Sequence, residues 1–523
     1  MTGAQGASPS DAAVPDGPTA PHDRAHHGND LTRKTAGGAT SLISARLASK
    51  AIDFVVLLIL ARLLAPTDFG IIAIAMTAIS IIEAVFELPL YQVLVSLDVI
   101  ERRHLDTAFT LGAMRGLAMA VILSAAAWPL AHFYHDPRLA GLILVLSVAP
   151  GLRGLGSPRL VTFAKRMDFR RELACEVICK LVSLMLAVTA AFTLRDYRAL
   201  AAGVLATPAA WVVATYVLAP YRPRFSLATW PLFASFVGWT SAAQFLSALN
   251  WQCDRLILGR TVTRPELGAY SLANDLSFIP EQALIKPVMR PLLSAFALIR
   301  DDRERLALAY LTAANAILAM GTPLLLTLSL LAGPTVRFAL GETWIPAIPI
   351  LQWLSLTLIP PLFTAPYGSL ALATGRAQGV LKQTAAEAVT KLPLMFVGAT
   401  LLGINGAIAA RGVSAVATAL LVVYLTRLLI GTSVVRQLAG TWRTIVASLV
   451  LAATLLVLRP LLNDVSGLVL GLRLALVAGA GFGSYAASLA LLWHLSGRPG
   501  GFEHAAFVRI INPLLGRFVP VPG

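Results

Sequence analysis

Long apolar stretches, separated by short polar connections, run along most of the chain from residue 38 to residue 495. A helix needs about 20 apolar residues to cross the hydrocarbon layer of a membrane, and open sheets cannot cross it because lipid leaves their backbone groups without hydrogen-bond partners. The pattern therefore predicts an all-α polytopic membrane protein. We expect fourteen transmembrane helices, at residues 38–60, 69–94, 107–133, 139–158, 173–194, 198–219, 230–254, 268–296, 306–332, 345–372, 379–401, 405–428, 443–459 and 468–495.

One short stretch of the chain occurs twice. Residues 62–75 read RLLAPTDFGIIAIA and residues 260–273 read RTVTRPELGAYSLA, which places the second copy 198 positions after the first. A period of this size indicates two halves built on one plan. Since six spans separate the copies, we expect two pseudo-symmetric six-helix bundles with the same orientation, at residues 31–225 and 226–430, followed by two additional transmembrane helices at 431–495.

The repeated stretch joins the first two spans of each bundle, and we interpret it as a structural hairpin rather than a site. We expect two glycines to permit the turns and two arginine–acid pairs to clasp them: Gly70 and Gly268, Arg62 with Asp68, and Arg260 with Glu266.

Composition supports the membrane interpretation and gives an orientation. The chain is 57% hydrophobic and 13% charged, whereas soluble domains carry about 25% charged residues. The net charge of +15 is therefore not read as nucleic-acid binding, because the arginines lie mostly in loops. With the N-terminus inside, 23 Lys and Arg outside the spans face the cytoplasm and 9 face the other side. The bias predicts that both termini are cytoplasmic, with a disordered tail at 1–30 and a second tail at 496–523.

Several charged residues fall inside predicted spans, where each one costs about 2.5–3.5 kcal/mol on insertion scales. Arg46, Lys50 and Asp53 share one helical face of the first span. The other intramembrane cations are Arg115, Arg153, Lys286, Arg290, Lys391 and Arg411. Two interpretations remain open: ion pairs that hold the bundle together, or a cation-lined cavity for an anionic substrate. Pairs one turn apart favour the first: Glu176 with Lys180, Glu387 with Lys391, and Lys50 near Asp53.

The eighth span, at 268–296, is interrupted by Pro280, Pro287 and Pro291. Proline removes a helical hydrogen bond, and freed carbonyls are tolerated in a membrane where they face protein or a wet cavity. A static kink and a moving helix that lines the cavity both fit this pattern.

No catalytic constellation emerges from the sequence. The chain has no phosphate-binding G-x-x-x-x-G-K-[ST] loop and no G-x-S-x-G turn. Its three cysteines lie in apolar segments without further ligands nearby, so we expect neither a metal nor a cofactor. The protein is therefore not expected to be an enzyme, and transport energy has to come from a gradient, the membrane potential or consumption of the product.

Four stretches resemble the polysaccharide transporter (Wzx-type oligosaccharide flippase) branch of the multidrug/oligosaccharidyl-lipid/polysaccharide exporter superfamily. They are ILARLLAPTDFGIIAIA at 59–75, DRLILGRTVTRPELGAYSLA at 254–273, FIPEQALIKPVMRPLLSAFALIRDDRERLALAYL at 278–311 and GETWIPAIPILQWLSL at 341–356. The resemblance implies a protein of the bacterial inner membrane that moves an undecaprenyl-pyrophosphate-linked oligosaccharide to the periplasmic leaflet, for exopolysaccharide or O-antigen synthesis. It implies lipids and polysaccharide polymerase or export machinery as partners, and no nucleic acid.

We expect the basic cavity to hold the pyrophosphate, with Arg46, Lys50, Lys391 and Arg411 as its main contacts. The alternative function is a cation-coupled multidrug antiporter of the same superfamily, for which Asp53 is the candidate coupling acid. A membrane-embedded polymerase or ligase is a third possibility, which the short outer loops disfavour.

Overall fold

The computed structural model describes residues 52–165, 168, 170–234, 238–463, 465–498 and 501–502. These residues form helices and connections and include no strand, as predicted. Nine helical segments among the described residues are long and apolar enough to cross a membrane. One of them, α19 (Gln378–Ile430), contains two of the predicted spans. The first predicted span lies partly outside the described residues, whose helix there covers 52–63.

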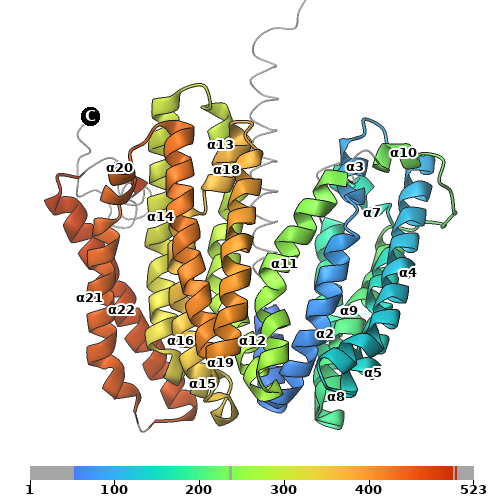
Figure 1. Cartoon of the computed structure of the whole chain (residues 1–523), viewed down its shortest axis with the longest axis horizontal. Helices are drawn as coiled ribbons and strands as arrows, with labels where there is room; N and C mark the ends of the chain where they lie inside the picture. Colours follow the sequence, from blue (N-terminus) through green and yellow to red (C-terminus); the bar gives the residue numbers. More distant parts are fainter. Residues whose placement is uncertain are drawn as a thin grey trace, which may run out of the picture.

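Figure 1 shows two groups of helices that meet at one end and diverge towards the other. We refer to residues 52–234 as the N-half and to residues 238–430 as the C-half. After the helix at 52–63, the N-half contains α2 (Pro66–Val85), α3 (Leu90–Ser96), α4 (Arg102–Phe133), α5 (Arg138–Leu146), α6 (Val148–Gly154), α7 (Leu160–Lys165), α8 (Arg170–Leu194), α9 (Tyr197–Leu218) and α10 (Trp230–Ala234). The C-half contains α11 (Gly238–Thr261), α12 (Arg264–Ser277), the π-helical turn η1 (Glu281–Ile285), α13 (Lys286–Leu298), α14 (Arg303–Leu330), α15 (Ala332–Ala339), η2 (Glu342–Trp344), α16 (Ala347–Thr357), α17 (Ile359–Thr364), α18 (Tyr367–Ala373) and α19.

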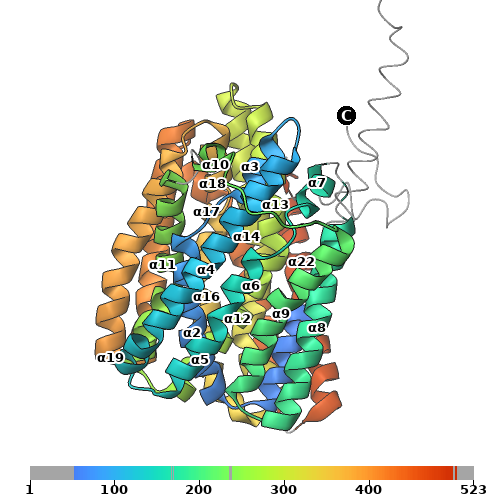
Figure 2. The same ribbon diagram turned by 90° about the vertical axis from the view of Figure 1, so that its right-hand side faces the viewer.

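The last helices pack on the outer side of the C-half. They are α20 (Val434–Ala439), α21 (Trp442–Leu458), η3 (Arg459–Leu462) and α22 (Gly467–Leu495). Leu331, at the end of α14, shares one buried cluster with residues of α21 and α22, and the Tyr485 hydroxyl donates to the Ala319 carbonyl at 2.8 Å. In the N-half, α8 and α9 lie side by side on the outside (Figure 2), and Ser183 donates to the Gly203 carbonyl at 2.8 Å between them.

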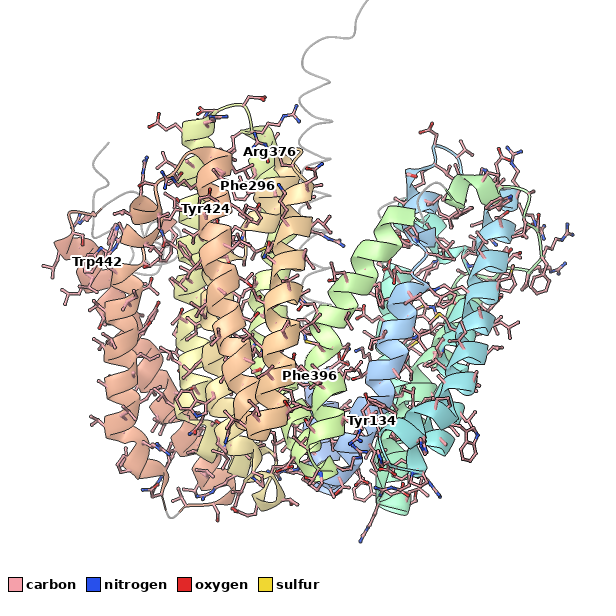
Figure 3. All side chains as sticks on the ribbon, in the orientation of Figure 1. Tyr134, Phe296, Arg376, Phe396, Tyr424 and Trp442 are labelled. Carbon is pink, nitrogen blue, oxygen red and sulfur yellow. The ribbon has the colours of Figure 1, made fainter. Side chains whose placement is uncertain are left out.

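The two halves share one hydrophobic core at the end where the repeated hairpins lie. This core combines Phe69 of α2 with Tyr270 of α12 and Trp344 of η2. Trp344 meets the Phe69 ring edge-on, with 5.1 Å between ring centroids, and its Nε1–H donates to the Ala61 carbonyl at 2.6 Å. Tyr134, at the end of α4, lies at the same end of the molecule (Figure 3), and its hydroxyl donates to the Leu256 carbonyl of α11 at 3.2 Å. We call this region the hairpin end.

The expectation that the two repeat glycines permit turns is wrong, because both lie inside helices. Gly70 is in α2 and Gly268 is in α12, where the two helices cross. A Cβ added to Gly70 would stand 2.1 Å from the Arg264 carbonyl oxygen, and one on Gly268 would stand 1.8 Å from the Pro66 carbonyl oxygen. The glycines therefore permit close contact between the halves.

The expected pairs of arginine and acid are also not the ones that form, because the two acids cap their own helices. Asp68 accepts from the Ala65 N–H at 3.0 Å, and Glu266 accepts from the Thr263 N–H at 2.9 Å. Acids in the first turn of a helix are favoured there by the helix dipole and the free N–H groups. Arg62 reaches into the C-half, where it donates to the Ala339 carbonyl at 2.9 Å and to the Phe338 carbonyl. Arg260 lies over the Phe133 ring, 6.0 Å from its centroid.

The structure extends the repeat beyond the hairpin. With the same offset of 198, Glu83 and Pro89 of the N-half correspond to Glu281 and Pro287 of the C-half. In both halves the second helix breaks here: α2 gives way to α3 after Pro89, and α12 gives way to α13 through η1. The interruption predicted from the prolines is thus present. A role for it in movement stays a prediction.

Candidate functional site

A cavity of about 460 Å³ lies within the C-half, lined by residues of α11, α12, η1, α13, α16, α17 and α19. We call it the C-half cavity. Lys391 and Arg411, both predicted as substrate contacts, line it. Each is more than nine-tenths buried, although each carries a charge.

The buried charges form one cluster around the carboxylate of Asp254. Lys391 Nζ lies 2.8 Å from Asp254 Oδ1, and Arg411 Nη1 lies 3.2 Å from Oδ2. The Tyr270 hydroxyl donates to Oδ2 at 2.8 Å. Two cations thus share one carboxylate, so the cluster keeps one excess positive charge beside the cavity. A buried charge is tolerated when it is paired and hydrogen-bonded, and this arrangement satisfies both conditions.

The fold of α19 explains why two distant cations meet at one carboxylate. Gly403 has φ 59° and ψ −134°, a backbone conformation that favours glycine. At this residue the helix turns back on itself. The two arms pack closely, because a Cβ on Gly406 would stand 2.0 Å from the Gly398 carbonyl oxygen. Lys391 lies on the first arm and Arg411 on the second, so the tight hairpin brings both towards α11.

Further contacts orient the side chains of the two cations. Lys391 Nζ donates to the Asn250 carbonyl at 2.9 Å, and Arg411 Nη1 donates to Asn274 Oδ1 at 2.6 Å. The Arg411 guanidinium also lies over the Phe278 ring, 5.0 Å from its centroid. The pairing expected between Glu387 and Lys391 is not the one that forms: Glu387 lines the cavity, while the carboxylate bonded to Lys391 is that of Asp254.

The remaining predicted cations of the C-half differ in position. Lys286 lines the cavity, with Nζ 5.6 Å from the centroid of the Trp251 ring. Arg290 is exposed and does not line it. The sequence alone did not assign Asp254 or Tyr270 to the site. Asp254 shortly precedes the second repeat and Tyr270 lies inside it, which was the available signal.

Arg115 and Arg153 line a different cavity, of about 420 Å³, inside the N-half. We call it the N-half cavity. Arg153 Nη1 lies 2.6 Å from Glu83 Oε1, and Arg115 Nη2 lies 3.9 Å from Glu87 Oε2. The structure therefore does not bring these two arginines together with Lys391 and Arg411 in one cation-lined cavity.

The predicted cations of the first span cannot be placed, since Arg46 and Lys50 lie outside the described residues. Asp53 is described, and its carboxylate pairs with Lys180 of α8. The expected partner of Lys180 was Glu176, one turn away on the same helix. The observed pair instead links the helix at 52–63 to α8.

Comparison with known proteins decides the family. The family model described as "Polysaccharide biosynthesis protein" matches residues 59–349, which include both hairpins and the start of the C-half. The chain belongs to this family.

Two relatives and one solved structure agree with this membership. The chain is 27% identical over 308 residues to the succinoglycan biosynthesis transport protein ExoT of Rhizobium meliloti, a match over 58% of this chain and 62% of ExoT, so it spans less than two thirds of that relative. It is 24% identical over 380 residues to the lipopolysaccharide biosynthesis protein WzxC of Escherichia coli, over 72% of this chain and 77% of WzxC. Its fold is similar to that of the lipid II flippase MurJ in an inward closed conformation, with a TM-score of 0.68, 13% identity, and coverage of 87% of this chain and 99% of MurJ. The predicted resemblance to polysaccharide transporters is confirmed by these relatives, and the described residues contain the apolar helices of a multi-pass membrane protein.

Proposed function

We propose that the protein translocates an undecaprenyl-pyrophosphate-linked oligosaccharide from the cytoplasmic to the periplasmic leaflet, for exopolysaccharide or O-antigen biosynthesis. The observation that carries this proposal is the cluster of Lys391, Arg411 and Asp254, in which two cations share one carboxylate beside a cavity. Family membership and the relatives named as biosynthesis transport proteins support it.

A pyrophosphate linkage suits this cluster chemically. The linkage is anionic, and its desolvation in a membrane is offset where charge-assisted hydrogen bonds replace water. The excess positive charge of the cluster attracts the linkage, while Asp254 keeps Lys391 and Arg411 in place before cargo arrives. The membrane potential, negative inside, favours outward movement of an anion by about 2.3 kcal/mol per charge per 100 mV.

The arrangement of the halves supports a mechanism of alternating access. In this proposal fourteen helices span the membrane, both termini are cytoplasmic, and bundles at 31–225 and 226–430 rock against each other. The hairpin end then faces the periplasm. Because the halves share a core there and diverge at the opposite end (Figure 1), we assign this structure, within the proposal, to a state that loads cargo from the cytoplasm.

The antiporter alternative depended on Asp53 as a coupling acid. Asp53 pairs with Lys180, and an acid already neutralised by an ammonium group is a poor site for cationic cargo. We therefore retain one proposed function.

The test is substitution of Lys391 in a strain that lacks the chromosomal gene. Lys391→Met removes one cation but leaves Asp254 paired with Arg411, so we expect the protein to fold. Surface polysaccharide should fall at least tenfold, and Lys391→Arg, which keeps the charge, should retain more export. Lys382→Met is the matched control, since Lys382 lies on the same helix but is exposed and does not line the cavity.

Protein level and thermal unfolding in detergent are measured for every variant. Wild-type polysaccharide output from Lys391→Met at a normal protein level would overturn the assignment of the cluster.

A further inference from the structure

The N-half cavity differs from the C-half cavity in its charge. Its two arginines each have a carboxylate partner, Glu83 for Arg153 and Glu87 for Arg115. Among the described residues that line this cavity the four charges cancel, whereas the cluster at Asp254 keeps one excess positive charge. An anion gains little from a neutral cavity. A ligand that is polar but uncharged is better matched to it.

The pair of Arg153 and Glu83 offers several hydrogen bonds to such a ligand. A guanidinium has five N–H donors and a carboxylate has about four acceptor positions, so the contact between these two side chains does not saturate either of them. Half of the Arg153 side chain and a quarter of the Glu83 side chain remain exposed. The Nε–H of Arg115 is buried and has no hydrogen-bond partner among the described residues. Hydrogen-bond donors and acceptors therefore both line the cavity.

Aromatic side chains form the other part of the lining. Trp211 enters from α9 and Tyr91 from α3, and 44% of Tyr91 is exposed. Aromatic rings offer an apolar face with a polar edge, which suits ligands that have both C–H faces and hydroxyl groups. Sugar rings have this character: hydroxyls around the rim, and C–H groups on the faces.

Close helix packing holds the wall in place. A Cβ on Gly154 would stand 2.2 Å from the Gly112 carbonyl oxygen, and one on Gly116 would stand 2.8 Å from the Pro150 carbonyl oxygen. These contacts join α4, which carries Arg115, to α6, which carries Arg153. The volume of about 420 Å³ is within the range of about 300–1,000 Å³ typical of ligand pockets.

We propose that the N-half cavity binds uncharged sugar residues of the cargo. This inference rests on the proposed function, because it gives the saccharide end of the same lipid a site separate from that of its anionic linkage. The C-half cavity then binds the anionic pyrophosphate linkage, and the N-half cavity binds the sugar. Both halves contact one molecule, which couples cargo binding to their relative position.

The experiment compares two ligands on the purified full-length protein. One is the sugar-bearing lipid extracted from a host strain in which polymerisation is blocked, and the other is undecaprenyl pyrophosphate without sugar. We expect the wild type to bind the sugar-bearing lipid at least tenfold more tightly. Trp211→Ala and Glu83→Gln should each reduce that ratio towards one. Trp211→Ala should leave the affinity for undecaprenyl pyrophosphate unchanged, whereas Glu83→Gln, which leaves the charge of Arg153 unbalanced, should leave it unchanged or raise it. Trp211→Phe, which keeps a ring, serves as the milder variant if Trp211→Ala does not fold.

The C-half variant Lys391→Met supplies the matched comparison, since it should weaken binding of both lipids. Equal wild-type affinity for the two lipids would overturn the sugar site and leave the proposed function standing. Loss of undecaprenyl pyrophosphate binding in Trp211→Ala or Glu83→Gln would also overturn it, by assigning the cavity to the pyrophosphate. A wild type that binds neither lipid would overturn the proposed function and the sugar site together.

Discussion

Gly70 and Gly268 lie against each other where α2 crosses α12, so that a Cβ on Gly268 would stand 3.0 Å from the backbone nitrogen of Gly70. The two residues occupy the same position in the two copies of the repeat, 198 residues apart. The repeat therefore contacts itself. Each glycine also approaches the first turn of the opposite helix, and the closure of the hairpin end depends on this approach.

Gly268→Ala should weaken the hairpin end. The added methyl group would meet the Pro66 carbonyl oxygen at 1.8 Å, and because this atom is backbone, α2 and α12 have to separate. Overpacking of this kind typically destabilises a protein by about 1–3 kcal/mol. Thermal unfolding in detergent should show a lower transition temperature. Gly141→Ala is the control, since a Cβ at Gly141 of α5 meets no atom of the described residues within 4 Å. Equal transitions in the two variants would contradict the crossing.

Arg62→Ala should lower the amount of folded protein before it lowers transport per molecule. The Arg62 side chain donates to the Phe338 and Ala339 carbonyls at the end of α15, where a cation also interacts favourably with the helix dipole. Its loss should cost about 1.5–3 kcal/mol, the range for hydrogen bonds that involve a charged group. Immunoblotting of membranes, with export normalised to protein level, checks this.

Arg198→Ala is the comparison for Arg62, because 68% of the Arg198 side chain is exposed and its pairing with Asp196 is a surface contact. We expect a normal level for this variant. A normal level of Arg62→Ala with lost export would give Arg62 a part in transport itself.

The helices could be predicted from the sequence because each apolar stretch is set by the thickness of the membrane. Contacts between different helices were harder to predict from the sequence. Asp254 and Lys391 are far apart in sequence, and their contact requires α11 to meet a hairpin whose turn depends on Gly403. Local spacing suggested Glu387 for Lys391, but residues one turn apart can interact without being the best-placed partners.

The repeat glycines show the same limit. Glycine after a short polar stretch is typical of turns, and this local rule gave the wrong role to Gly70 and Gly268. Their function depends on a contact between the two halves, which no single copy of the repeat encodes. The duplication itself was visible in the sequence. The contact between the copies was not.

Asp136 should give the hairpin end a dependence on acidic pH. It lies in the connection between α4 and α5 and accepts hydrogen bonds from Arg138 at 3.1 Å and Arg264 at 3.3 Å. Burial acts to raise the pKa of this carboxyl, but the two guanidinium groups outweigh burial and hold the pKa below its usual value. Its contribution to stability is therefore present above the unfolded pKa of about 3.9 and is lost as the pH falls through the lower folded pKa.

Asp136→Asn tests this pH dependence. At pH of about 7 the variant should be less stable than the wild type by about 1–3 kcal/mol, because Arg138 and Arg264 lose a charged acceptor. As the pH falls below the unfolded pKa of about 3.9 the advantage of the wild type should shrink, and the two proteins should converge once the pH has fallen through the lower folded pKa of Asp136. Unfolding transitions across the acidic range measure the difference. A difference that stays constant with pH would show that the charge of Asp136 is not what stabilises the loop.

Exchanging the charges of Asp53 and Lys180 tests whether Asp53 is part of a structural ion pair or is a coupling site. The two side chains join the helix at 52–63 to α8, and both are partly buried, with exposed fractions of 38% for Asp53 and 24% for Lys180. Asp53→Lys alone and Lys180→Asp alone each place two like charges together, so we expect a lower level of folded protein. The double variant restores an opposite pair and should recover both protein level and polysaccharide export. A coupling acid would have to stay at position 53, so recovery of the level without recovery of export would assign Asp53 a coupling role in transport.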